Sequence, residues 1–209
     1  MPRPVLTARD LEEIADGGEI AISPDTLITP LARDAAVQRG IQIRIEQPKS
    51  QSSNYARVVA LGADHGGFAL KEQLKNYIRD WGYTPLDLGT SSTDAVDYPD
   101  FAEAVANAVA RGDAWRGVVV DSAGIGSSIA ANKVPGARAA LCYDRASARN
   151  SREHNDANIL SLGARMISEE NAREILAVWL ETPFAGGRHQ NRINKILAIE
   201  SRHQKPKGT

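Results

Sequence analysis

Two glycine-rich segments, residues 58–67 and 117–128, contain the groups best suited to chemistry. Each begins with an apolar run and ends in a glycine-containing turn, the pattern of a parallel strand that gives way to a helix. Glycines at such a turn let main-chain N–H groups approach an anion closely. The first turn also contains Asp64 and His65, and the second contains Asp121, all of which can exchange protons. Together the two segments indicate acid–base chemistry on a small phosphorylated molecule.

Asp121 is the residue on which the catalytic interpretation most depends. It follows a Val-Val-Val run, so it is expected at the carboxyl end of a buried central strand. A carboxylate that is partly desolvated there is a candidate general base at neutral pH. The structural alternative is that Asp121 caps the short helix that follows. Ser122 has the same two interpretations, as a donor to a substrate oxygen or as a cap.

A second group of polar residues lies later in the chain. His154 and Asn155 belong to a dense polar run, residues 151–158, and are expected at the same sheet edge as the glycine turns. Cationic side chains follow, namely Arg165 and the group of Arg188, His189 and Arg192. Two glycines precede Arg188 at the start of a predicted helix, so the helix N-terminus and two guanidinium groups are suited to clamping one phosphate. The same group is equally compatible with an exposed basic turn.

Two further residues, His65 and Tyr98, have two interpretations each, and Cys142 has one. His65 is a proton donor or phosphate ligand, or else a loop residue that caps the next helix. Tyr98 presents its phenol at a helix start, or packs in the core. Cys142 is most simply a small buried hydrophobic residue. The four histidines show no metal-ligand spacing, so no metal site is expected.

Composition narrows the class of protein. The 209 residues are 42% hydrophobic and 24% charged, which is typical of a globular protein. The formal net charge of −1 argues against a nucleic-acid partner, and a single cysteine excludes an internal disulfide. No apolar run approaches the roughly 20 residues needed to span a bilayer, and the N-terminus lacks the apolar core of a signal peptide. We therefore expect a soluble, cytoplasmic protein with no membrane partner.

The order of apolar runs predicts a small N-terminal module and a larger α/β domain. The predicted divisions are a docking or targeting module at residues 1–45, a linker at 46–56, the main domain at 57–200 and a flexible tail at 201–209. Strands are predicted at 58–62, 84–88, 117–121, 139–143 and 159–163, with helices at 67–80, 99–111, 124–133, 145–153, 169–181 and 188–203. This alternation is typical of a Rossmann-like, doubly wound sheet of five parallel strands.

Six short motifs occur in a specific order, at residues 62–67, 97–101, 124–126, 129–133, 151–158 and 186–189. Through them the chain, from Val58 to Ile199, resembles the type B ribose-5-phosphate isomerase family, which includes the galactose-6-phosphate isomerase subunits. The resemblance implies metal-free aldose–ketose isomerisation of a sugar phosphate with no cofactor. It also implies a homodimer, or a dimer of dimers, with active sites at the subunit interface.

The resemblance implies roles for individual residues. Asp64 and His65 would line the sugar site, with Tyr98 and Asn155 nearby. His154 would assist ring opening. Phosphate would be held by four residues, some of them from the partner subunit: Arg165, Arg188, His189 and Arg192. The chain departs from the family where Asp121 replaces the usual cysteine base. Ser127 stands where other members have a glutamate, and Ala123 replaces the hydroxyl residue that assists ring opening.

The N-terminal module has a resemblance of its own. Residues 6–10 and 28–34 are similar to short segments attached to bacterial microcompartment enzymes. This similarity implies targeting to a microcompartment, with shell or cargo proteins as partners. An ordinary docking appendage is an equal alternative.

The expected function is isomerisation of ribose 5-phosphate, or a close analogue, through a cis-enediolate. Asp121 would move a proton between C1 and C2, while Ser122 and the N–H groups around Gly124 and Gly126 would stabilise the enediolate oxygen. The alternative is a non-catalytic sugar-phosphate binding protein, or a microcompartment assembly protein, on the same fold.

Overall fold

The computed structural model describes residues 4–23, 26–45 and 58–204. The chain divides into two compact units, residues 1–53 and 54–209, and each is described separately. The predicted linker, residues 46–56, lies outside the described residues.

The N-terminal unit consists of two strand–helix–strand halves. The first contains β1 (Val5–Leu6), the 3-10 helix η1 (Ala8–Leu11) and β2 (Glu19–Ile22); the second contains β3 (Leu27–Ile28), α1 (Pro30–Gln38) and β4 (Gln42–Ile45). Strand β1 pairs in parallel with β3, and β2 pairs in parallel with β4. The unit is therefore an internal repeat with an offset of about 22 residues, a relationship that the sequence analysis missed.

Capping residues explain where the helices of this unit begin and end. Thr29 accepts a hydrogen bond from the N–H of Ala32 at 3.2 Å, and Pro30 takes the first helical position. The segment after Thr7 forms a single 3-10 turn. Gly17 and Gly40 follow the two helices with φ of 78° and 65°, a region that glycine enters without steric cost.

The larger unit is built around a five-stranded parallel sheet in the order β6-β5-β7-β9-β8. Its strands are β5 (Val58–Ala63), β6 (Thr84–Asp87), β7 (Arg116–Asp121), β8 (Ala139–Leu141) and β9 (Ile159–Gly163). Its helices are α2 (Phe68–Asp80), α3 (Tyr98–Arg111), α4 (Ile125–Ala131), α5 (Arg145–Asn155), α6 (Glu169–Glu181) and α7 (Arg188–His203). The predicted Rossmann-like fold class is confirmed.

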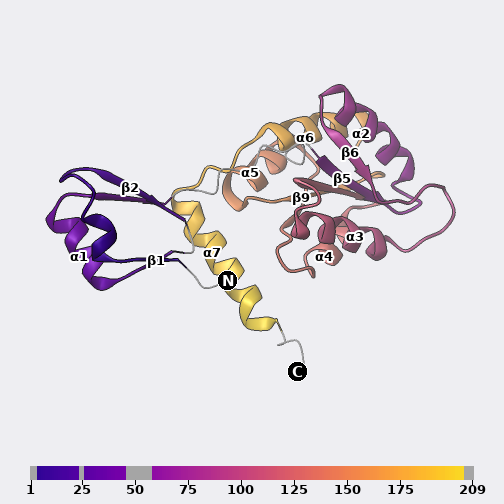
Figure 1. Cartoon of the computed structure of the whole chain (residues 1–209). Helices are drawn as coiled ribbons and strands as arrows, with labels where there is room; N and C mark the ends of the chain where they lie inside the picture. Colours follow the sequence, from indigo (N-terminus) through magenta and orange to yellow (C-terminus); the bar gives the residue numbers. More distant parts are fainter. Residues whose placement is uncertain (1–3, 24–25, 46–57, 205–209) are drawn as a thin grey trace. The chain divides into compact units, whose positions relative to one another are not determined.

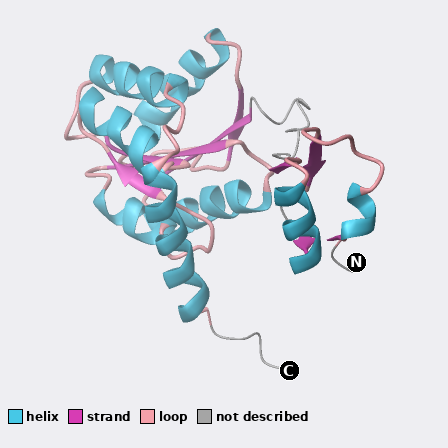
Figure 2. Cartoon of the chain, turned by 90° about the vertical axis from the view of Figure 1, so that its left-hand side faces the viewer, coloured by secondary structure: helices cyan, strands magenta, loops and turns pink. Residues whose placement is uncertain are grey.

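Helices cover both faces of this sheet (Figure 1). Apolar side chains of α2, α5 and α6 pack on one face, and those of α3 and α4 pack on the other. Figure 2 shows the strands as a layer between the two sets of helices. All six residues of β7 are buried, as expected for a central strand with both faces covered.

Two predicted boundaries need correction. The tail expected from residue 201 is helical through His203, because α7 continues to that residue, while 205–209 lie outside the described residues. Strand β8 is shorter than predicted and ends at Leu141. No helix among the described residues is long and apolar enough to cross a membrane.

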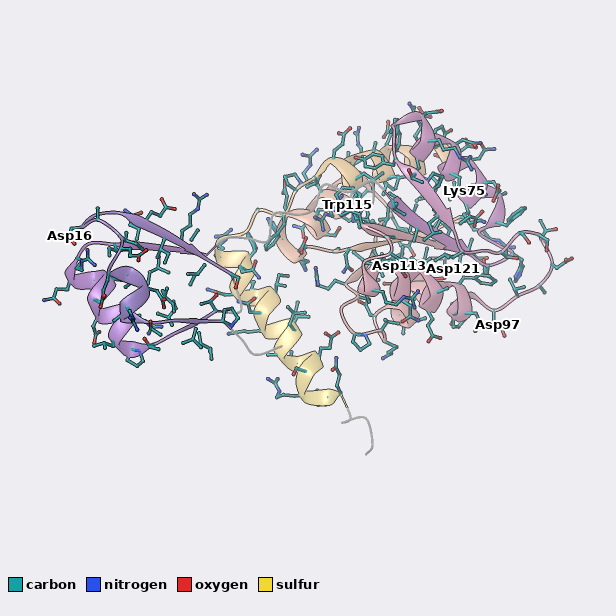
Figure 3. All side chains as sticks on the ribbon, viewed as in Figure 1. Asp16, Lys75, Asp97, Asp113, Trp115 and Asp121 are labelled. Atoms are coloured by element: carbon teal, nitrogen blue, oxygen red, sulfur yellow. The ribbon has the colours of Figure 1, made fainter. Side chains whose placement is uncertain are left out.

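Strand register defines two opposite edges of the sheet. At what we call the carboxyl edge, Asp121 pairs with Gly163; at the amino edge, Gly117 pairs with Ile159. At about 3.3 Å per residue, the six residues of β7 separate these edges by roughly 15–20 Å. Trp115, the residue before β7, and Asp121, its last residue, are labelled in Figure 3.

Candidate active site

The first glycine turn places Asp64 and His65 at the carboxyl edge. Asp64 directly follows β5, is only 7% exposed, and accepts the N–H of Gly67 at 2.9 Å. Its carboxylate therefore closes the turn that leads into α2. A Cβ at Gly67 would collide with the carbonyl oxygen of Val120 in the neighbouring strand, so only glycine fits there.

His65 is exposed beside this turn, and its ring is oriented by the loop before α3. Nδ1 lies 3.3 Å from the main-chain nitrogen of Val96 and 3.2 Å from the oxygen of the same residue. Nε2 has no partner among the described residues and is available to a ligand.

The second glycine turn lies against the first and against Tyr98. A Cβ at Gly66 would collide with the hydroxyl oxygen of Ser122, and one at Gly126 would come within 2.5 Å of Cζ of Tyr98. The N–H of Arg165 donates to the carbonyl oxygen of Ser122 at 3.0 Å, which brings that residue to the same edge. The carboxyl edge thus gathers Asp64, His65, Tyr98, Asp121, Ser122, Gly124, Gly126 and Arg165.

Asp121 does not stand free at this edge. One carboxylate oxygen accepts the N–H of Ala123 at 2.8 Å and that of Gly124, and the other accepts the N–H of Ser127 at 2.9 Å. The side chain is only 5% exposed. The expectation of an unengaged carboxylate is therefore wrong, because both oxygens already accept main-chain N–H groups. Asp121 therefore stabilises the turn between β7 and α4 by accepting its main-chain N–H groups.

The other predicted site residues gather at the amino edge. His154 and Asn155 end α5, which runs from the carboxyl end of β8 back to the amino end of β9. Arg188, His189 and Arg192 lie on the first turns of α7, which packs against α5. The expectation that His154 and Asn155 share an edge with the glycine turns is wrong, since a helix joining parallel strands carries the chain to the opposite edge.

Two histidine rings form the centre of this second group. The rings of His154 and His189 are stacked, with centroids 4.2 Å apart and planes 7° apart. His189 is 7% exposed, and its buried Nδ1 has no hydrogen-bond partner among the described residues. Burial and the nearby charges of His154, Arg188 and Arg192 lower the pKa of His189. Such a group is suited to an anionic ligand, which would pair with the cations around the two rings.

Asn150 is a member of this group that the sequence analysis missed. Its amide nitrogen lies 2.8 Å from Nδ1 of His154, four residues further along α5. The i, i+4 spacing was the available signal, because such residues share one helix face. The described residues contain no cluster of histidine, cysteine or carboxylate side chains that could hold a metal ion.

Comparison with known proteins places this arrangement in a family. Residues 59–196 match the family described as Ribose/Galactose Isomerase. The chain is 45% identical to a putative sugar phosphate isomerase of Bacillus subtilis over 146 residues, covering 69% of this chain and 98% of the relative. It is 44% identical to ribose-5-phosphate isomerase B of Escherichia coli over 144 residues, covering 69% of this chain and 97% of that protein.

A solved structure agrees with these matches. Ribose-5-phosphate isomerase B of Clostridium thermocellum superposes with a TM-score of 0.70 at 48% identity, over 70% of this chain and 99% of that one. The N-terminal unit lies outside the matched residues. From residue 59 to residue 196, the chain belongs to the ribose/galactose isomerase family.

Proposed function

We propose that this protein isomerises a phosphorylated aldose, with ribose 5-phosphate as the first candidate, to the corresponding ketose. The observation that carries the proposal is the match along nearly the whole length of relatives named ribose-5-phosphate isomerase B. The two groups of residues described above fit such a reaction, since one is rich in cations for a phosphate and the other in polar groups for a sugar.

The reaction requires a balanced set of proton movements. Opening the sugar ring removes a proton from the anomeric hydroxyl, breaks the bond between C1 and the ring oxygen, and adds a proton to that oxygen. Isomerisation then moves a proton from C2 to C1 and another from the C2 hydroxyl to the C1 oxygen, through a cis-enediolate. We assign ring opening to His154 and phosphate binding to Arg188, His189 and Arg192.

At the carboxyl edge, the proposal gives Asp121 and His65 different tasks. Asp121 already accepts three N–H groups, so we assign it to holding the turn on which Ser122 lies. An imidazole titrates near neutral pH, and Nε2 of His65 is available at this edge. His65 is therefore the candidate for proton transfer, while Ser122 and Tyr98 contact the sugar.

A complete site then needs two copies of the chain. The phosphate-binding group lies at the amino edge and the proton-transfer group at the carboxyl edge, roughly 15–20 Å apart across β7. A pentose phosphate cannot span that distance within one sheet. A two-fold dimer brings the amino edge of one copy to the carboxyl edge of the other. Exposed apolar side chains available for such contacts are Ile125 and Ile129 on α4 and Ile196, Leu197 and Ile199 on α7.

For the N-terminal unit, we propose docking to a microcompartment shell or its cargo. The support is the similarity of residues 6–10 and 28–34 to segments on microcompartment enzymes, together with the separation of this unit from the isomerase unit. Co-purification of shells with the full chain, compared with a chain that lacks residues 1–53, tests this. Equal recovery of both forms would contradict the docking role.

Deuterium exchange tests the isomerase proposal directly. The full chain is incubated with ribose 5-phosphate in deuterated water, and ketose formation and deuterium incorporation are followed by NMR. We expect both. Saturable binding without exchange would instead favour the non-catalytic binding protein, and turnover of another sugar phosphate in a substrate panel would redefine the substrate.

A further inference from the structure

His154 is held by two contacts that together leave one ring nitrogen available. Its Nδ1 lies 2.8 Å from the amide nitrogen of Asn150, and its face is covered by the ring of His189. The stack fixes the ring plane, and the amide fixes the rotation of the ring within that plane. Nε2 of His154 has no partner in the described part of the chain.

Ring opening needs this nitrogen in a defined protonation state. The proton that leaves the anomeric hydroxyl and the one that reaches the ring oxygen must pass through a group that both accepts and donates. With its amide turned so that the oxygen faces the ring, Asn150 accepts from Nδ1–H, and neutral His154 then carries its proton on Nδ1 and leaves Nε2 free to accept one. Nε2 takes up and returns the proton that moves, while the hydrogen bond at Nδ1 stays in place in both protonation states.

Packing does not account for an asparagine at this position. Asn150 is exposed on α5, where asparagine is a poorer helix former than leucine or alanine. Among the described residues, its side chain hydrogen-bonds only to His154. The contact with His154 is therefore the feature that accounts for an asparagine at this position.

We propose that Asn150 is a positioning residue for ring opening, which acts by orienting His154 and pairing with its Nδ1 in both protonation states. This inference rests on the proposed function, because it assigns a task within the same site. It names no direct contact between Asn150 and the sugar.

Two substitutions separate positioning from folding. Asn150→Leu keeps the approximate size and suits a helix but removes both hydrogen-bonding groups. Asn150→Asp keeps an acceptor for Nδ1–H. The matched control is Asn76→Leu, since Asn76 is also exposed on a helix, α2, and within the described part of the chain hydrogen-bonds only to Arg79, at 3.0 Å.

The readout compares a cyclic with an open-chain substrate. Ribulose 5-phosphate has no free hydroxyl that can close a five- or six-membered ring onto its carbonyl, so deuterium exchange at its C1 reports proton transfer without ring opening. We expect Asn150→Leu to lower kcat for ribose 5-phosphate roughly 5- to 10-fold, the equivalent of one lost hydrogen bond, with KM little changed. Exchange into ribulose 5-phosphate should stay within about 2-fold of the unmodified protein.

Each outcome has one meaning. The proposal is supported if Asn150→Asp turns over ribose 5-phosphate within about 3-fold of the unmodified protein and Asn76→Leu turns it over at the unmodified rate. Equal loss of turnover and exchange in Asn150→Leu, or full activity in that variant, overturns it. If the unmodified protein shows neither turnover nor exchange, the proposed function itself fails, and that result is distinct from failure of the Asn150 assignment.

Discussion

The imidazole rings of His154 and His189 lie face to face, 4.2 Å between centroids, across the contact between α5 and α7. Two charged rings at this distance would repel, and Arg188 and Arg192 add further positive charge. Burial and these charges lower the pKa of His189. A phosphate dianion placed among the same groups acts in the opposite direction on the pKa of His189, because negative charge favours the protonated ring.

Phosphate binding is therefore expected to raise the pKa of His189 and to be accompanied by proton uptake. Titrating the histidine signals by NMR with and without inorganic phosphate measures the shift. The chain has four histidines, and His189→Asn identifies the relevant signal. An unchanged His189 titration in saturating phosphate would contradict the assigned phosphate site.

The lowered pKa of His189 also has a consequence for stability. In the window between that pKa and the unfolded value near 6.5, the unfolded chain binds a proton that the folded chain does not. The free energy of unfolding should thus rise with pH through this window and fall as the solution becomes more acidic. Urea titrations at several pH values should show a weaker dependence for His189→Asn, while His203→Asn, on the last turn of α7, serves as the control.

Mixing of inactive subunits tests whether the site is shared between copies. His65→Asn and His154→Asn alter opposite edges of the sheet, so a mixed dimer has one site with both changes and one with neither. Random mixing of two inactive variants should restore about one quarter of the activity, because half of the dimers are mixed and each has one intact site. The control mixture, His154→Asn with His189→Asn, alters the same edge and should restore nothing. Equal results for the two mixtures would contradict a shared site.

Arg116 links the core to the loop that precedes the phosphate-binding group. Its guanidinium is buried, donates to the carbonyl oxygens of Trp179 and Leu180 at 2.6 and 2.8 Å, and lies 4.0 Å from the ring centroid of Trp115. Arg116→Lys should lower the free energy of unfolding by about 2–3 kcal/mol, since an ammonium cannot reproduce this fork. Arg111→Lys, at an exposed ion pair with Asp113, should cost less than about 0.5 kcal/mol. Similar urea midpoints for both variants would show that the buried contacts contribute little.

Sequence patterns predicted the strands and helices of the larger unit because apolar runs and capping residues act locally. The position of His154 was misjudged, although the rule needed to place it was available: α5 follows the carboxyl end of β8 and must end at the amino edge. The hydrogen bonds of Asp121 agree with the alternative that it caps the helix that follows, since Ser127 lies in the first turn of α4. Sequence could not decide between cap and base, because the choice depends on how the turn from Ala123 to Ser127 folds back.

The contacts of Asp121 lead to a prediction about both stability and rate. Asp121→Ala leaves three N–H groups without their acceptor, so the free energy of unfolding should fall by about 1–3 kcal/mol. Asp144→Ala removes a comparable cap, the acceptor for the N–H of Ser147, at an exposed helix start and should cost about 1 kcal/mol.

The rate of deuterium exchange then shows whether Asp121 only stabilises the turn or also acts as the general base. Asp121→Asn retains an oxygen that can accept from the N–H groups of Ala123 and Gly124, but an amide cannot take a proton from carbon. Because we assign the carboxylate to holding the turn, exchange into ribulose 5-phosphate should fall by no more than about 10-fold in this variant, whereas His65→Asn should lose it by roughly 100-fold or more. A folded Asp121→Asn protein without exchange, beside an active His65→Asn protein, would mean that the carboxylate leaves its three N–H partners during turnover and takes the proton itself.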